Sequence, residues 1–178
     1  MTHWVISDTH FDHTNIIKYC NRPFSDVKEM DNVLLNNIND VVKTHDILWH
    51  LGDFIYGRST LCLSDYDRYL HYTSFINCKN IILILGNHDD IVKKTPKIQQ
   101  MFLMVLPYFV GYLNGQAYTL SHYPSDHKYQ KYINQFSNYN KPCINLFGHV
   151  HNNSHNNNPY NISVEQTNYK PVKLKDIL

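Results

Sequence analysis

Short apolar runs recur along the chain, and each of them ends at a cluster of polar residues. Five of these runs have the length of β-strands, at residues 3–7, 47–51, 81–85, 118–121 and 144–147. After the first run, apolar residues return at helical spacing, at Met30, Val33, Leu34, Ile38, Val41 and Val42. Further helices are expected at residues 15–19 and 62–75. This alternation of strands and helices predicts an α/β fold with parallel neighbouring strands.

The second half of the chain is richer in strand signals. Strands are expected there at residues 105–113, 116–121, 143–147 and 160–165. The first two flank Asn114-Gly115, which is a strong signal for a β-hairpin. The last two flank the Asn-rich residues 151–158, interpreted as an exposed connector. We expect residues 170–178 to form an extended tail with a short terminal turn, and residues 1–178 to form a single domain.

Composition narrows the class of protein without identifying a partner. The formal net charge of the 178 residues is +1, so charge gives no argument for binding to nucleic acid or to a membrane. The chain shows no signal peptide and no apolar stretch near the ~20 residues that span a bilayer. We therefore expect a cytoplasmic protein, whose oligomeric state the sequence leaves open. Twelve histidines are many for this length and are the first hint of metal chemistry.

The polar clusters at the strand ends contain residue types that bind metals. The carboxyl ends of parallel strands form one rim, so seven side chains are expected to meet there: Asp8, His10, Asp53, Asn87, His122, His149 and His151. Buried histidines that bond to the backbone explain any one member but not the whole set. Oxygen and nitrogen donors without thiolates favour Mn, Fe, Zn or Mg. Seven donors suit a pair of cations, and one carboxylate can bridge them.

In chain order, the clusters read Asp8-x-His10, Gly52-Asp53, Gly86-Asn87-His88-Asp89, His122 and Gly148-His149-x-His151. This order resembles the five-block signature of the calcineurin-like metallophosphoesterases, over residues 5–151. The resemblance implies a four-layer α/β/β/α sandwich of two mixed sheets. It also implies two divalent ions, for which we expect Mn²⁺, with Fe, Zn, Mg or Ni as alternatives.

The resemblance also implies a role for each side chain. The first metal would be held by Asp8, His10, Asp53 and His151. The second would be held by Asn87, His122 and His149, with Asp53 bridging both. His88 would not bind metal but would be catalytic, binding phosphate and assisting the leaving group.

The implied reaction is hydrolysis of a phosphate ester by a hydroxide that bridges the two metals. We expect a phosphodiesterase rather than a phosphomonoesterase, acting on small phosphorylated molecules or nucleotides, with nucleic acid as a further candidate substrate. Three alternatives stay open: a phosphomonoesterase, a non-catalytic scaffold of the same fold, and a structural zinc protein. The scaffold is disfavoured because every block is complete. A structural zinc site is disfavoured because such sites have four closed ligands, often cysteines.

The sequence departs from some relatives in its second block. Tyr56 stands where the protein Ser/Thr phosphatases have an aspartate that orients the catalytic histidine, so Asp89 or a backbone carbonyl is considered for that role. Residues 8–24 resemble a short bacterial and phage branch of the family.

Three basic side chains near these blocks are candidates for contacts with substrate phosphate, namely His13, Arg22 and Arg58. The alternative for Arg22 is that it anchors a loop on the core. Residues 124–142 are rich in Tyr and Lys, and they are interpreted either as a flap over the site or as a solvated connection.

Overall fold

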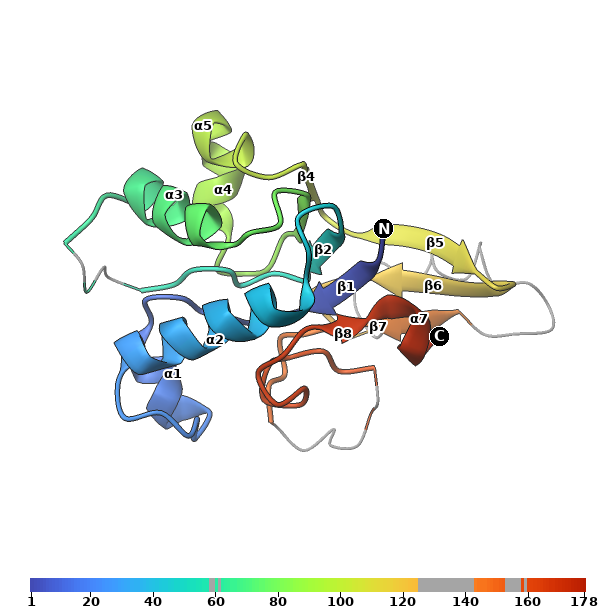
Figure 1. Ribbon diagram of the computed structural model, residues 1–178, viewed down its shortest axis with the longest axis horizontal. Helices are drawn as coiled ribbons and strands as arrows, with labels where there is room; N and C mark the ends of the chain where they lie inside the picture. Colours follow the sequence, from blue (N-terminus) through green and yellow to red (C-terminus); the bar gives the residue numbers. More distant parts are fainter. Residues whose placement is uncertain (58–59, 61, 125–142, 153–157, 159) are drawn as a thin grey trace.

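The computed structural model describes residues 1–57, 60, 62–124, 143–152, 158 and 160–178. Its strands form a five-stranded sheet and a three-stranded sheet (Figure 1). The strands are β1 (His3–Ile6), β2 (Ile47–His50), β3 (Ile81–Ile84), β4 (Met104–Leu106), β5 (Phe109–Leu113), β6 (Gln116–Leu120), β7 (Ile144–Leu146) and β8 (Val172–Lys173). The helices are α1 (Thr14–Tyr19), α2 (Val27–Val41), α3 (Asp65–Phe75), α4 (Asp90–Lys94), α5 (Pro96–Gln99) and α7 (Leu174–Ile177).

The larger sheet has the order β4-β3-β2-β1-β8, in which the first four strands are parallel and β8 is antiparallel to β1. Both faces of this sheet are buried. In β3, Ile81 and Leu83 belong to the core beneath the helices, whereas Ile82 and Ile84 belong to the core between the sheets. This explains why residues 81–85 are all apolar and do not alternate with polar residues, since parallel strands covered on both faces are apolar throughout.

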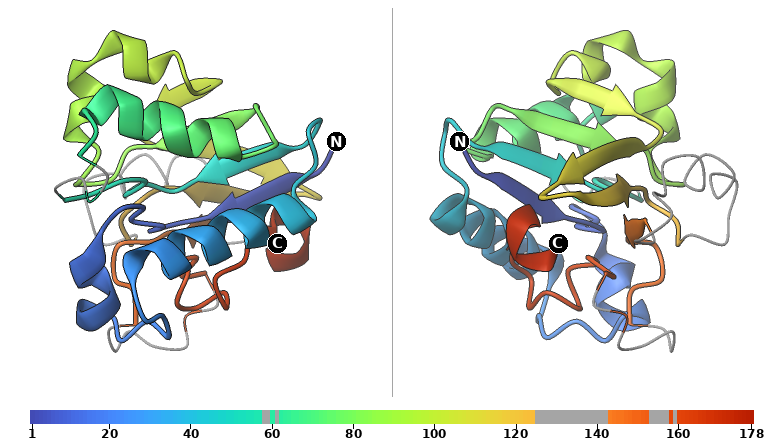
Figure 2. Two further views of the ribbon diagram at one scale, coloured as in Figure 1. Left: turned by 60° about the vertical axis from the view of Figure 1, so that its left-hand side comes forward. Right: turned by 90° about the vertical axis from the view of Figure 1, so that its right-hand side faces the viewer.

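Helices α2 and α3 lie over the outer face of the larger sheet, as Figure 2 shows, and α1, α4 and α5 add residues to the same core. The α2 helix begins at its N-cap Asp26, whose side chain accepts a hydrogen bond from the backbone N–H of Glu29, 2.8 Å away. Its fully buried Met30, Leu34 and Ile38 pack into the same core as the strands. No helix in the described ranges is long and apolar enough to cross a membrane.

The smaller sheet has the order β5-β6-β7 and packs against the other face of the larger one. Tyr118 and Leu120 of β6 share a core with Val5 of β1 and Trp49 of β2. The Asn114-Gly115 hairpin is confirmed, because β5 and β6 pair antiparallel on either side of it. The α/β fold with two mixed sheets is therefore confirmed.

The boundaries of two predicted strands are wrong. Residues 105–113 are not one strand, because β4 pairs with β3 in the larger sheet while β5 belongs to the smaller one. Pro107 lies between them and has no N–H for a sheet hydrogen bond. Residues 160–165 form only isolated bridges, at Asn161 and Ser163, instead of a strand.

The tail and the loops differ in part from what the sequence predicts. The predicted tail at residues 170–178 contains β8 and α7, so it closes the edge of the larger sheet beside β1. The short helices α4 and α5 after β3 were not predicted. Most of the predicted flap, residues 125–142, lies outside the described residues, as does most of the Asn-rich connector, residues 153–157.

A buried carboxylate joins the outer helices to the first strand-end loop. Asp31 of α2 accepts hydrogen bonds from the Tyr72 hydroxyl of α3 at 2.6 Å and from the backbone N–H of Asp12 at 3.0 Å. Burial raises the pKa of Asp31 from 3.8 to about 7, although these two hydrogen bonds oppose the rise. The folded chain therefore holds a proton on Asp31 that the unfolded chain releases at lower pH.

The Asp31→Asn variant should show a weaker dependence of stability on pH. Because the folded pKa of Asp31 is raised, the folded protein binds more protons between pH ~4 and ~7, and the free energy of unfolding falls as the pH rises through that window. Asp31 therefore contributes at most about 4 kcal/mol to the free energy of unfolding at low pH, at 1.4 kcal/mol per unit of difference between its folded and unfolded pKa. This contribution is lost at high pH. Urea denaturation at pH 4.5 and 7.5 measures it. Identical pH dependence in wild type and variant would show that Asp31 is not responsible.

Candidate metal centre

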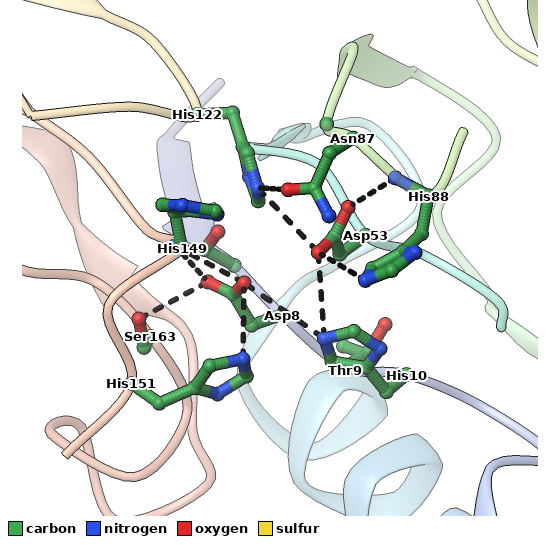
Figure 3. Close-up of polar contacts among 12 residues, drawn as sticks. Asp8, Thr9, His10, Asp53, Asn87, His88, His122, His149, His151 and Ser163 are labelled. Atoms are coloured by element: carbon green, nitrogen blue, oxygen red, sulfur yellow. Dashed lines mark hydrogen bonds and ion pairs between the residues drawn. The ribbon is translucent and has the colours of Figure 1, made fainter. Parts of the chain in front are cut away.

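The candidate site lies where the carboxyl ends of β1, β2, β3, β6 and β7 meet, so both sheets contribute to it (Figure 3). Just beyond these ends, the backbone enters the left-handed region at Asp8 (φ 59°), His10 (50°), Asp53 (55°), His149 (69°) and His151 (47°). Residues other than glycine rarely adopt this conformation, and it is concentrated at functional sites. These turns carry five of the seven predicted ligands, and Asn87 and His122 lie beside them at the ends of β3 and β6.

Two buried carboxylates form the middle of the site. Asp8 and Asp53 are 0% and 2% exposed. Asp53 Oδ2 lies 3.5 Å from His10 Nε2 and 3.5 Å from His122 Nε2, so one oxygen faces both halves of the cluster. Asp8 Oδ1 lies 3.7 Å from His151 Nε2. This arrangement fits a carboxylate that bridges two cations.

His10 provides the test of whether a metal fits. Its side chain is 2% exposed, and neither ring nitrogen has a hydrogen-bond partner among the described residues. Burial lowers the pKa of His10 well below its usual value, so the ring is neutral and one nitrogen has a free lone pair. A buried polar atom without a partner costs about 1–3 kcal/mol. A cation between His10, Asp8 and Asp53 would remove this cost.

His122 is held with Nε2 toward the carboxylates. Its Nδ1 donates to the Leu51 carbonyl at 2.8 Å, while Nε2 lies 2.9 Å from Asn87 Oδ1. Burial lowers the pKa of His122, but Asp53 and Asp8 outweigh burial and raise it to about 9. A proton on Nε2 therefore occupies the position that a metal would take, and metal binding would release it.

His149 is placed differently from the other predicted ligands. Its ring packs against His122 and Tyr123, with centroids 5.0 and 4.8 Å away. Its backbone N–H, rather than its ring, contacts Asp8, at 3.0 Å from Oδ2. The assignment of His149 to the second metal stays a prediction.

His88 stands at the rim of the site with its side chain 30% exposed. Its backbone N–H donates to Asp53 Oδ1 at 2.9 Å, and its Nε2 lies 3.9 Å from Asp53 Oδ2. The ring of Tyr56 packs on the His88 ring, with centroids 3.8 Å apart and planes 43° apart. Tyr56 therefore restrains His88 by ring contact, a role for which the sequence suggested the carboxylate of Asp89 or a backbone carbonyl.

Asp89 does not orient His88. Its buried carboxylate accepts backbone hydrogen bonds from Gly86 at 2.8 Å, from Asp53 at 2.8 Å and from Phe54 at 3.2 Å. It therefore ties the loop after β2 to the loop after β3. Burial, together with the nearby Asp53, raises the pKa of Asp89 to about 6. The sequence showed Asp89 as part of a motif but not this connecting role.

The structure places the three side chains predicted to contact substrate phosphate in different surroundings. Arg22 is buried, and all of its guanidinium nitrogens donate to protein groups, which contradicts contact with substrate and supports the alternative of an anchor. His13 is 8% exposed and packs its ring against Tyr56, 4.6 Å away, so its contact with phosphate stays a prediction. Arg58 lies outside the described residues.

Two further residues, Ser163 and Glu165, contact the site although neither belongs to a sequence motif. Ser163 Oγ donates to Asp8 Oδ2 at 3.1 Å. Glu165 Oε1 accepts a hydrogen bond from His151 Nδ1 at 2.9 Å. Both follow the last block, in a segment that was expected to be a strand. Only the three-dimensional fold brings them to the site.

Known proteins resemble this chain in sequence and in fold. The family model for calcineurin-like phosphoesterases matches residues 1–166. An uncharacterized protein of Methanocaldococcus jannaschii is 36% identical over 179 residues, covering 96% of this chain and 86% of the relative. A crystal structure of a protein of unknown function from Aquifex aeolicus has a TM-score of 0.66 and 25% identity, with 99% and 97% of the two chains covered. The structure of a Pseudomonas putida nuclease matches at a TM-score of 0.46 and 20% identity, covering 84% of this chain and 61% of the nuclease.

The Gly148→Ala variant should lose metal binding. A Cβ at residue 148 would collide with Ser7 Oγ and Asp8 Oδ2, so the loop that holds His149 and His151 must move away from Asp8. We expect less than one equivalent of Mn²⁺ per chain after dialysis, measured by elemental analysis. The control is Gly115→Ala at the hairpin tip, where a Cβ meets nothing within 4 Å. Because Gly115 has a positive φ of 78°, this control should lose some stability but keep its metal. Equal metal content in the two variants would contradict the prediction.

Proposed function

Because this chain belongs to the calcineurin-like phosphoesterase family, we propose that it is a metal-dependent hydrolase of phosphate esters with two divalent cations at the strand ends. The observation that carries the proposal is the buried His10, which lies beside Asp8 and Asp53 and whose ring nitrogens have no hydrogen-bond partner among the described residues. A buried neutral imidazole next to two buried carboxylates is the donor set of a hard or borderline cation. Manganese is our first choice, with Fe, Zn, Mg and Ni as alternatives.

The proposed ligands divide between two positions around Asp53. Asp8, His10 and His151 would hold one cation, and Asn87, His122 and His149 would complete the other, with Asp53 shared. The distances of 3.5 Å from Asp53 Oδ2 to both His10 Nε2 and His122 Nε2 support this sharing. When bound, the cations would activate a water molecule and neutralise charge on the phosphoryl oxygens.

His88 is the proposed catalytic residue. It lies at the rim, its side chain is partly exposed, and it is not one of the seven proposed ligands. An imidazole there can hold a proton for the leaving oxygen of the ester. The Tyr56 ring and the hydrogen bond from the His88 backbone to Asp53 restrain the ring, so that less freedom is lost when substrate binds.

The proposed substrates are phosphodiesters in preference to phosphomonoesters. The support for this preference is the partial exposure of His88, whose side chain is 30% exposed among the described residues, so that a second ester group on the phosphorus could extend past it. Small phosphorylated molecules and nucleotides are the first candidates, and the net charge of +1 gives no separate support for nucleic acid. A panel of aryl diester, aryl monoester, cyclic nucleotide and single-stranded DNA with Mn²⁺ tests the preference. Hydrolysis of the monoester alone would overturn it.

The Asp53→Asn variant should lose at least ~100-fold in rate, because a neutral amide cannot neutralise two cations. Hydrolysis of an aryl diester and Mn²⁺ content are measured together. The matched control is Asp46→Asn, since Asp46 is also buried but accepts its hydrogen bonds from Thr2 and Trp4, away from the site. Wild-type turnover by Asp53→Asn at saturating Mn²⁺ would refute a shared carboxylate.

The His88→Asn variant should bind the same amount of Mn²⁺ as wild type but hydrolyse esters ~100–10,000-fold more slowly, the range for loss of a general acid. The loss should be largest for a poor leaving group such as an alkoxide and smallest for a nitrophenolate, which departs without a proton. Steady-state rates with both esters measure this. An equal loss for both would contradict proton donation by His88, and loss of metal would make it a ligand.

A further inference from the structure

Glu165 connects the candidate metal centre to a buried arginine. Its side chain is 4% exposed, and its Oε1 accepts hydrogen bonds from His151 Nδ1 at 2.9 Å and from Arg22 Nε at 2.9 Å. Arg22 Nη2 is also 2.8 Å from the same oxygen. One carboxylate oxygen therefore binds both a proposed metal ligand and a fixed positive charge.

Arg22 extends the connection to the first strand-end loop. Its Nη2 donates to the Asp8 carbonyl at 2.7 Å, and its Nη1 donates to the Thr9 carbonyl at 2.9 Å. The side chain is 0% exposed, so these bonds are shielded from water. A single guanidinium thus holds the backbone at Asp8 and, through Glu165, the ring of His151. These two ligands are 143 positions apart in the sequence.

The hydrogen bond to Glu165 determines which nitrogen of His151 is available. A carboxylate can only accept at Nδ1, so Nδ1 carries the proton and Nε2 is left to face Asp8 Oδ1, 3.7 Å away. Histidine ligands generally need such a partner for their other nitrogen, and its loss typically lowers metal affinity 10–100-fold. Glu165 has the position and the chemistry for this task.

We propose that Glu165, held by Arg22, is a positioning residue that fixes the tautomer and direction of His151 for metal binding. The inference rests on the proposed function, since it assigns a task at the same metal centre. Arg22 has two roles: it holds the carboxylate of Glu165 and it holds the backbone carbonyl of Asp8, so it fixes the two groups relative to each other. The ion pair thereby holds together the first and the last ligand of the site.

Equilibrium dialysis of the full chain against Mn²⁺ tests this proposal, with the dissociation constant as the readout. We expect Glu165→Ala to raise the constant 10–100-fold. Glu165→Gln keeps an oxygen that accepts from Nδ1–H and should cause a smaller rise. Asp46→Asn, a buried carboxylate far from the site, should lower thermal stability but leave the constant of the folded protein unchanged.

The outcomes separate this proposal from the proposed function. If wild type binds no Mn²⁺ or other divalent metal, the metal-dependent function fails and the positioning role with it. If wild type binds metal and Glu165→Ala binds it equally well, only the positioning role is overturned. If Glu165→Ala does not fold, Glu165→Asp decides, because the shorter side chain withdraws the carboxylate from His151 Nδ1 while keeping its charge. A dissociation constant of Glu165→Asp equal to that of wild type overturns the proposal.

Discussion

The burial of two carboxylates side by side is the constraint on which the rest of the site depends. Asp8 and Asp53 are almost completely removed from water, and like charges in that position are unstable unless positive charge compensates them. The protein surrounds them with imidazole rings and with the backbone N–H groups of His88 and His149. The left-handed turns, the close approach of Gly148 to Asp8 and the Asp89 cross-link keep this arrangement in place. The proposed divalent cation would complete its charge balance.

Much of this could be predicted from sequence because the decisive signals are local. An apolar run that stops at Gly-Asp or Gly-Asn-His marks a strand end, and parallel strands bring such ends to one rim. The parallel pairing of β1 with β2 and of β2 with β3 agrees with the parallel neighbours that the α/β alternation predicts. The Asn114-Gly115 turn is equally local, and the hairpin formed where it was expected.

The features that escaped prediction depend on side-chain direction and on contacts between distant segments. Pro107 ends one strand and sends the chain to another sheet, which a run of apolar residues does not reveal. Asp89 belongs to a motif, yet its use as a backbone cross-link depends on the approach of two loops. Tyr56 contacts the His88 ring at a position where some relatives have an aspartate. Glu165, which bonds to His151, belongs to none of the sequence motifs.

The bond from Ser163 to Asp8 joins residues 155 positions apart, and the one from Arg22 to Glu165 spans 143. During synthesis on the ribosome, the first ligand therefore emerges long before the groups that fix its surroundings. Contacts of such long sequence separation form late in folding, because the chain must first close a large loop. A nascent chain that ends before residue 165 has the earlier ligands without these supports, so the proposed cations would be bound firmly only after residue 165 has been made.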